Sequence, residues 1–220
     1  LDAKLRVQMR AEISRIQRQL SVTTVYVTHD QIEAMTMGDR VAVMRKGLLQ
    51  QFDAPQRLYE APANLFVASF IGSPAMNMLE GTIEEGGARV GSALLPAPPA
   101  LAGSVGKHVA VGIRPEALNL PGTDDRPRLR GRVATVEALG PEQLAHVEIE
   151  AQPVLADEVL EGLVDADDAK ELAELADASR ATVVARLDAS ATVRPDDQIE
   201  LAVDGRHLHF FDLDTGEACR

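Results

Sequence analysis

The sequence predicts a short α/β segment followed by an all-β domain, which a helical, acidic insertion interrupts. Residues 1–72 alternate between helical and strand patterns, and residues 73–220 hold short strand-like runs between turn signals. Residues from about 155 to 180 are acidic and helical in composition. Alternating helices and strands are typical of α/β folds, whereas many short strands indicate a barrel or sandwich. We therefore expect a domain boundary near residue 73, giving domains 1–72 and 73–220.

The first half of the α/β segment begins with an amphipathic helix. Apolar residues recur there at spacings of three and four: Leu5, Met9, Ile13, Ile16 and Leu20. Asp2 is a candidate N-cap of this helix. The β-branched run at 22–28 then predicts a strand buried on both faces, as in a parallel sheet. Because Leu1-Asp2 is not a natural start, we expect the chain to begin inside a longer protein.

The second half of the segment completes the α/β pattern. Asp30 is expected to cap a short helix, with Glu33 three residues later completing a capping box. Strands are expected at 41–44 and 48–52. Residues 53–56 are expected to open a helix, with a cap and a first-turn proline, and a further helix is expected at 64–71, closed by Gly72.

The all-β domain is predicted from short apolar runs separated by glycine and proline turns. The runs lie at 80–83, 88–90, 108–113, 131–137, 145–149, 182–187 and 199–203. Residues 157–180 interrupt them with nine acidic residues against two basic ones. We interpret this insertion as a solvated helical excursion, with a docking surface for a regulatory protein as the alternative.

Composition limits the classes of function. The net charge of −12 argues against nucleic acid as a partner, because neutralising phosphates requires a basic face. No apolar run approaches the roughly 20 residues that span a bilayer, and no signal peptide is visible. The single cysteine, Cys219, fits a reducing compartment. These features indicate a cytoplasmic protein.

His29 is the strongest candidate for a ligand-binding or catalytic residue. It comes directly after a strand predicted to be buried, and ligands of open α/β sheets bind at the carboxyl ends of the strands. An imidazole there could donate a hydrogen bond to a phosphate and help orient an attacking water. The alternative is a strand-end histidine that only satisfies local backbone groups.

A long, ordered resemblance favours the first interpretation. Val27-Thr28-His29-Asp30-Gln31-Ile32-Glu33-Ala34-Met35 resembles the switch-histidine segment of ABC-transporter ATPases. Residues 39–44 with Gly47, then 53–55 and 70–77, are similar to the later segments of the ATPase domain in the maltose/glycerol-phosphate/trehalose importers. Residues 112–116, 137–140, 208–212 and 215–216 resemble the OB-like regulatory (TOBE-type) domain of the same subgroup. Asp196-Asp197 departs from the family, which more often has Gly-Asp there.

The resemblance implies specific roles and partners. His29 would contact the γ-phosphate of ATP, and Asp2 would belong to the loop that crosses to the opposite subunit. The full-length parent would use ATP and Mg²⁺, would sit on the inner face of the membrane through permease subunits, and would form a homodimer through its regulatory domain. Carbohydrate import is the implied function.

The chain lacks the other parts of an ATPase site. No G-x-x-x-x-G-K-[ST] loop, no apolar strand ending in Asp-Glu and no Ser-Gly-Gly-Gln signature occur in it. Phosphoryl transfer depends on positioning and charge neutralisation by such parts. We therefore expect no ATPase activity and no bound cofactor for this chain alone.

The remaining candidates carry less chemistry. The Asp165–Asp168 run lacks the glycine and glutamate of a Ca²⁺ loop. His207 and His209 alternate on an expected strand without a third ligand nearby, so no metal site is predicted. Arg114 is expected to form a structural ion pair. The alternatives to a transporter subunit are a stand-alone OB-like ligand-binding module and a dimerisation module without a ligand.

Overall fold

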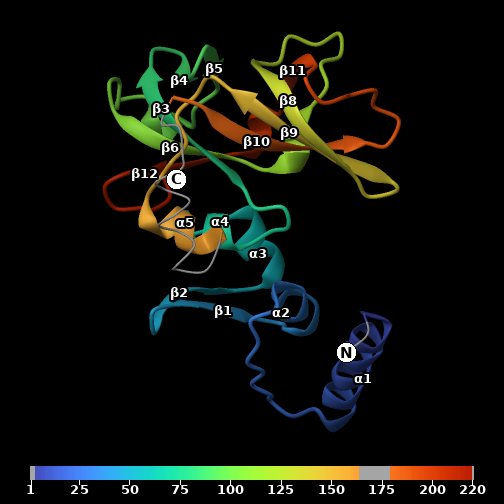
Figure 1. The fold of residues 1–220 in the computed structure, drawn as a ribbon. Helices are drawn as coiled ribbons and strands as arrows, with labels where there is room; N and C mark the ends of the chain where they lie inside the picture. Colours follow the sequence, from blue (N-terminus) through green and yellow to red (C-terminus); the bar gives the residue numbers. More distant parts are fainter. Residues whose placement is uncertain (1–2, 164–178, 220) are drawn as a thin grey trace. The chain divides into compact units, whose positions relative to one another are not determined.

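The computed structural model describes residues 3–163 and 179–219 (Figure 1). The chain divides into two compact units, unit 1 at Leu1–Pro62 and unit 2 at Ala63–Arg220. The boundary expected near residue 73 therefore lies within unit 2, after its first helix. Each unit is described separately.

Unit 1 contains three helices and a β-hairpin (Figure 1). Helix α1 spans Ala3–Leu20, α2 spans Gln31–Met37 and α3 spans Pro55–Glu60. Strands β1 (Val41–Arg45) and β2 (Leu48–Asp53) pair antiparallel across the two-residue turn Lys46-Gly47. Both turn residues have positive φ, 48° and 80°, which is the conformation of a tight hairpin turn whose twist matches the strands. The elements at 31–37, 41–45 and 48–53 lie where the sequence predicted them, but the α/β fold expected for residues 1–72 is not confirmed, because the described strands form only an antiparallel hairpin.

The prediction of a strand at 22–28 is wrong. Residues 22–28 have no regular secondary structure, and the side chains of Val25 and Val27 are 88% and 89% exposed. A strand exists only where a neighbour takes its backbone hydrogen bonds, and no described residue pairs with this run. The β-branched composition therefore predicted a strand, but no strand forms here, because this run has no pairing partner within the described residues.

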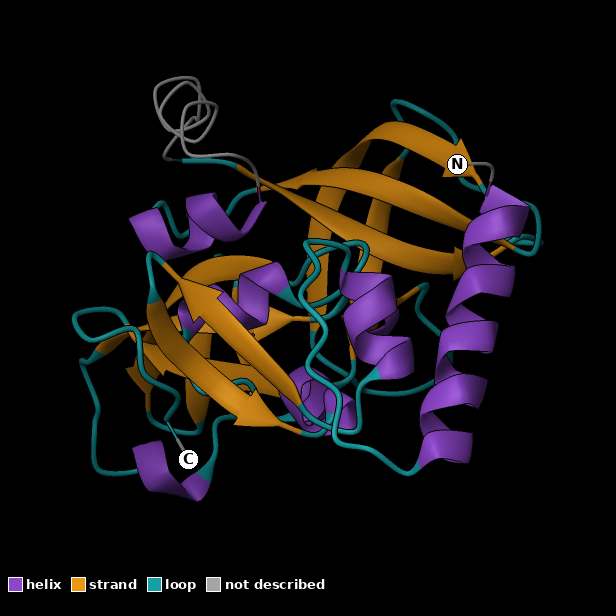
Figure 2. Ribbon diagram, turned by 90° about the horizontal axis from the view of Figure 1, so that it is seen from below, coloured by secondary structure: helices purple, strands orange, loops and turns teal. Residues whose placement is uncertain are grey.

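Unit 2 is built from two antiparallel five-stranded sheets, drawn orange in Figure 2. The first sheet has the order β12-β6-β3-β4-β5 and the second β10-β9-β8-β11-β7. The first comprises β3 Asn77–Glu84, β4 Gly87–Val90, β5 Ala93–Leu95, β6 His108–Ile113 and β12 Leu208–Asp212. The second comprises β7 Leu118–Asn119, β8 Arg128–Ala138, β9 Glu142–Ile149, β10 Ala181–Asp188 and β11 Gln198–Val203. Three short 3₁₀ turns lie in the connections between strands, at Pro99–Leu101, Pro115–Ala117 and Gly205–His207.

A single hydrophobic core joins the two sheets. Its members alternate along the strands with exposed residues, as β10 shows with Ala181, Val183, Ala185 and Leu187 all buried. Strands β3 to β12 all contribute to this cluster, which consists mainly of Val, Leu, Ile and Ala. Burial of this alternating face is the main term that stabilises such sheets. The all-β domain expected from the sequence is confirmed in this form.

Helices α4 and α5 cover one end of unit 2 (Figure 1). Helix α4 (Leu65–Phe70) is capped by Asn64, whose side chain accepts a hydrogen bond from the Val67 amide at 3.0 Å. Helix α5 (Asp157–Leu163) packs against it so closely that a Cβ on Gly162 would lie 2.1 Å from Ser69 Oγ. Both helices contribute to a second apolar cluster beneath them.

The acidic insertion is only partly described. Helix α5 forms its beginning, whereas residues 164–178, including the Asp165–Asp168 run, lie outside the described residues. The helical character expected for the whole of 155–180 therefore has support only at Asp157–Leu163. Within the helices that the structure describes, none has the length and hydrophobicity that a bilayer crossing requires.

Candidate functional site

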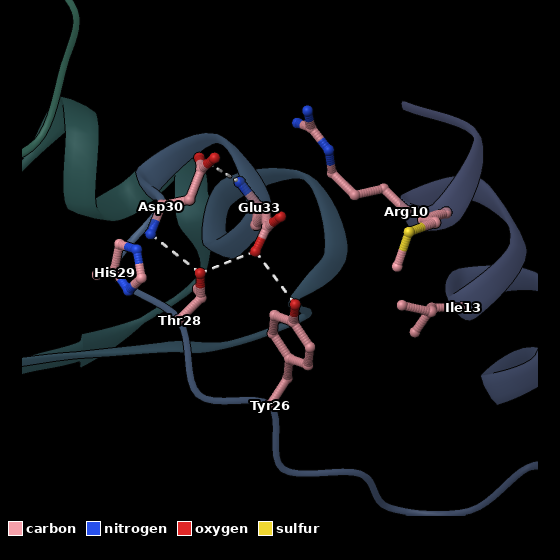
Figure 3. A pocket seen from close by; sticks show the side chains of 8 residues that line it. Arg10, Ile13, Tyr26, Thr28, His29, Asp30 and Glu33 are labelled. Carbon is pink, nitrogen blue, oxygen red and sulfur yellow. Dashed lines mark hydrogen bonds between the residues drawn. The ribbon is translucent and has the colours of Figure 1, made fainter. Parts of the chain in front are cut away.

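His29 lies in the loop that leads into α2, not at the end of a strand as the sequence suggested. Its side chain is exposed, and it forms no hydrogen bond or ion pair with any described residue. Figure 3 shows the imidazole at the edge of a pocket between this loop, α1 and α2. An exposed, unengaged imidazole is available to a ligand, whereas the alternative role of satisfying local backbone groups is not observed.

The loop around His29 is held by the carboxylate of Glu33. One oxygen of Glu33, Oε2, accepts hydrogen bonds from Thr28 Oγ1 at 2.8 Å and from the Tyr26 hydroxyl at 3.1 Å (Figure 3). Thr28 Oγ1 in turn accepts a hydrogen bond from the Asp30 amide at 3.0 Å. The residues on both sides of His29 are thus connected to the first turn of α2.

Asp30 caps α2 as expected. Its Oδ1 accepts hydrogen bonds from the amides of Ile32 at 2.8 Å and Glu33 at 3.2 Å, which satisfies two of the free N–H groups at the helix start. The second half of the expected capping box is different. The Asp30 amide donates to Thr28 Oγ1 rather than to the Glu33 side chain, because the threonine hydroxyl lies between the two groups.

The pocket beside His29 has a volume of about 270 Å³ and combines charged and apolar groups. Arg10 and Ile13 of α1 face the loop and α2 across it (Figure 3). The full set of lining residues is Met9, Arg10, Ile13, Tyr26, Thr28, His29, Asp30 and Glu33. Two carboxylates among these residues oppose the binding of a whole polyphosphate. The pocket therefore places one imidazole and one guanidinium beside two carboxylates, which is not a complete anion site.

Tyr26 titrates differently from a free tyrosine. Its hydrogen bond to the Glu33 carboxylate raises the pKa of the phenol, and the neighbouring charge of Asp30 acts in the same direction. A phenol that donates to a carboxylate is favoured in its protonated form. Tyr26 is therefore a hydrogen-bond donor in this network at neutral pH.

The other residues singled out by sequence do not join this site. Asp2 lies outside the described residues. His207 ends a 3₁₀ turn and is exposed, whereas His209 is on β12, so the two do not share a strand. No group of three or more His, Cys, Asp and Glu side chains is placed to hold a metal ion anywhere in the described ranges. Cys219 is half-buried, and burial raises the pKa of its thiol.

Arg114 has a structural role. The side chain is 2% exposed, and its guanidinium donates hydrogen bonds to the carbonyls of Ala68 and Ile71 at the end of α4. These carbonyls lie at the C-terminal end of a helix, where the last C=O groups have no N–H donor within the helix. The sequence predicted a structural ion pair for Arg114, and these hydrogen bonds to helix-end carbonyls give the side chain a structural role.

Comparison with known families accounts for much of unit 2. Residues 72–118 match the MalK OB fold domain, and residues 111–173 match the TOBE domain. The two matches cover strands β3 to β6 of the first sheet, strands β7, β8 and β9 of the second sheet, and helix α5. Proteins that resemble the whole chain complete the comparison. The trehalose/maltose import ATP-binding protein MalK of Thermococcus litoralis is 39% identical over 99% of the chain.

Residues 72–173 belong to the MalK OB fold and TOBE domain families, and the chain is similar over nearly its whole length to the family of sugar-importer ATP-binding subunits.

Further members of the family match at similar or higher identity. The trehalose import ATP-binding protein SugC of Mycobacterium tuberculosis is 41% identical over 98% of the chain. The diacetylchitobiose uptake system ATP-binding protein MsiK of Streptomyces coelicolor is 58% identical, over 53% of the chain and 32% of its own length. The chain covers 54% of the MalK relative and 56% of the SugC relative. It therefore spans about half the length of these full-chain matches.

Proposed function

We propose that this chain is the C-terminal part of the energy-coupling ATP-binding subunit of a carbohydrate importer. The observation that carries the proposal is the match to such subunits over nearly the entire chain, unit 1 included. Unit 2 corresponds to the regulatory domain of these subunits and unit 1 to a remnant of their α/β ATPase domain. A stand-alone ligand-binding or dimerisation module is not favoured, because it leaves the similarity of unit 1 unexplained.

Within this proposal His29 contacts the γ-phosphate of ATP. The exposed imidazole without a partner among the described residues supports this role, as does the short capped helix that fixes the loop after it. A histidine in this place can donate a hydrogen bond to the terminal phosphate and orient the attacking water. Asp2 would belong to the loop that reaches the opposite subunit.

The residues of this chain do not fit a whole nucleotide or its Mg²⁺. The pocket beside His29 holds two carboxylates, and the sequence contains no glycine-rich loop whose amides could hold the phosphates. When bound, ATP and Mg²⁺ would supply the phosphoryl group and neutralise its charge. The chain's own contribution is restricted to presenting His29, and the remaining groups would come from elsewhere in the full-length subunit.

ATP hydrolysis tests the role of His29. In the full-length subunit we expect His29→Ala to lower the turnover number by two or more orders of magnitude while nucleotide affinity changes little. His108→Ala, in which an exposed histidine of unit 2 is removed, is the matched control. The 220-residue chain alone is expected to show no turnover. Turnover by the isolated chain that His29→Ala abolishes would contradict the proposal.

The partners of the full-length protein are inferred from the same proposal. We infer membrane-spanning permease subunits, a second copy of the chain bound through unit 2, and a position on the cytoplasmic face of the membrane. Light scattering of the chain tests the dimer: a mass of two copies is expected from about 10 µM upward, and a monomer at all concentrations would exclude it.

The acidic insertion offers a place for a regulatory protein. The proposal rests on its charge, nine acidic against two basic residues within 157–180, and on the packing of its first helix against α4. Deleting residues 155–180 from the full-length protein tests it. Unchanged transport and unchanged regulation would leave the insertion as a solvated excursion only.

A further inference from the structure

We propose that Glu33 is the positioning residue for His29, acting through the hydroxyl of Thr28. This inference deepens the proposed function and rests on it for the role of His29. It assigns a role to Tyr26 and Thr28, for which the sequence predicted none, and a new role to Glu33, which the sequence had placed in a capping box.

The direction of each hydrogen bond is fixed by chemistry. An ionised carboxylate only accepts, so Thr28 and Tyr26 must each donate their hydroxyl hydrogen to Glu33 Oε2. The Thr28 oxygen is then left with lone pairs only, and one of these accepts from the Asp30 amide. Because a single arrangement of hydrogens satisfies the chain of bonds, the Thr28 hydroxyl has one orientation.

The same bonds restrict the backbone around His29. Thr28 precedes it and is bonded to Glu33 at 2.8 Å, whereas Asp30 comes after it and is bonded both to Thr28 and to the first turn of α2. His29 is thus enclosed between two residues that are anchored to one rigid element. Its own ring makes no bond with the described residues, so the anchoring acts on its backbone position rather than on its side chain.

Charge-assisted hydrogen bonds explain why a glutamate performs this task. A bond to an ionised acceptor is stronger than one between neutral groups. Thr28 and Glu33 are both half-buried, which reduces competition from water, whereas Tyr26 is 50% exposed. The Thr28 bond should therefore restrict the loop more than the Tyr26 bond does. A catalytic group displaced by about 1 Å can lose two orders of magnitude in rate.

A graded set of substitutions tests the inference in the chain itself. Both accepted bonds end on one oxygen, so the amide oxygen of Glu33→Gln can replace it, whereas Glu33→Ala removes both bonds. Thr28→Val removes the hydroxyl at nearly constant shape, and Thr28→Ser retains it. Glu60→Gln is the matched control, because Glu60 is a helical glutamate that also accepts a side-chain bond, from Gln56 at 2.7 Å.

The first measurement is ¹⁵N relaxation of the His29 amide. We expect Glu33→Ala and Thr28→Val to lower the order parameter of residues 28–30 from about 0.85 to below about 0.6. Tyr26→Phe and Glu33→Gln should have smaller effects, because the first removes the weaker bond and the second removes only the charge assistance, whereas Thr28→Ser and Glu60→Gln should stay close to the unmodified chain. An order parameter in Glu33→Ala equal to that of the unmodified chain would overturn the inference. An order parameter that falls as far in Glu33→Gln as in Glu33→Ala would overturn it as well.

The second measurement is ATP turnover by the full-length subunit. Glu33→Ala should lower kcat about tenfold with little change in KM, and Glu33→Gln should restore most of the rate. Combined with His29→Ala, Glu33→Ala should cause no further loss, because it acts through His29. If Glu33→Ala lowered kcat as much in the His29→Ala background as it does alone, Glu33 would have a role independent of His29, and the inference would be contradicted. If His29→Ala itself leaves turnover unchanged, the proposed function fails, while the relaxation data still decide whether Glu33 positions the loop.

Discussion

The side chain of Asn77 pairs with both backbone polar groups of Val184 and so joins the two sheets of unit 2. Its Oδ1 accepts from the Val184 amide at 2.7 Å, and its Nδ2 donates to the Val184 carbonyl at 3.0 Å. The same Nδ2 also donates to the Ile113 carbonyl at 3.0 Å. Asn77 therefore makes, from β3, the hydrogen bonds with β10 that a neighbouring strand would otherwise make. In this way its side chain links β10 to the sheet that contains β3 and β6.

Removing this amide should destabilise unit 2. Asn77 is 8% exposed, so Asn77→Leu leaves buried amide and carbonyl groups without partners, which costs about 2–4 kcal/mol of unfolding free energy. Urea denaturation followed by circular dichroism measures the loss. Asn119→Leu is the control, because that side chain makes one long hydrogen bond of 3.4 Å at the surface. Equal effects of the two substitutions would contradict the bridging role.

Gly87 is expected to tolerate no side chain. A Cβ on Gly87 would lie 2.2 Å from the carbonyl oxygen of Leu95, which is backbone and cannot move aside without breaking the pairing of β4 with β5. Gly87→Ala should cost about 2 kcal/mol or more of unfolding free energy. Gly103→Ala meets nothing within 4 Å and should be neutral. A thermal midpoint unchanged by Gly87→Ala would show that the strands can separate there.

The stability of unit 2 should fall in mild acid because of His209. Burial lowers the pKa of His209 to about 4, and the charges of Arg114 and His207 act in the same direction, against Glu116. The unfolded chain takes up the proton near pH 6.5, before the folded one does. Stability is therefore present above about pH 6.5 and is lost as the pH falls toward 4, by about 2–3 kcal/mol in total.

Denaturation midpoints between pH 4 and 7 check this dependence. His209→Gln should flatten the curve over that interval, whereas His108→Gln, at an exposed histidine, should leave its slope unchanged. A curve of the same slope for His209→Gln would assign the acid sensitivity to other groups.

The start of α2 depends on Asp30. Asp30→Ala removes the acceptor of two helix amides and should cost about 1 kcal/mol of local stability, whereas Asp30→Asn keeps it. Faster amide hydrogen exchange at residues 32–34 reports the loss. Asp39→Ala, beyond the end of the helix, serves as control. Protection unchanged in Asp30→Ala would mean that packing rather than capping fixes this helix.

Sequence reasoning recovered most strands of unit 2 because alternation is a local signal. His108–Ile113 was predicted with its observed bounds, and six other runs fell within observed strands. Strands β5 and β7 were missed, since three and two residues are too short to show a period, and β12 was expected only as a strand around His207 and His209 without bounds. The run at 22–28 was predicted as a strand from composition alone, although a strand depends on neighbours that composition does not reveal.

The candidate site was predicted in part. His29 and the cap at Asp30 were identified from the order of residues, because a cap is formed within three positions of the chain. The bonds from Thr28 and Tyr26 to Glu33 were not predicted. The Thr28-x-Asp30 spacing was a signal only for the bond that Thr28 Oγ1 accepts from the Asp30 amide, since a threonine can accept a hydrogen bond from the amide two positions later. The approach of α1 to the pocket is tertiary and has no local signal.

The bond between Asn77 and Val184 spans 107 residues of sequence. During synthesis, β3 and β6 therefore leave the ribosome long before β10 and β12, which complete the two sheets. Until then the apolar faces of the early strands lack their cover, and loop closure of this length slows folding. Nascent chains of this domain should accordingly need protection by a chaperone until their last strands emerge.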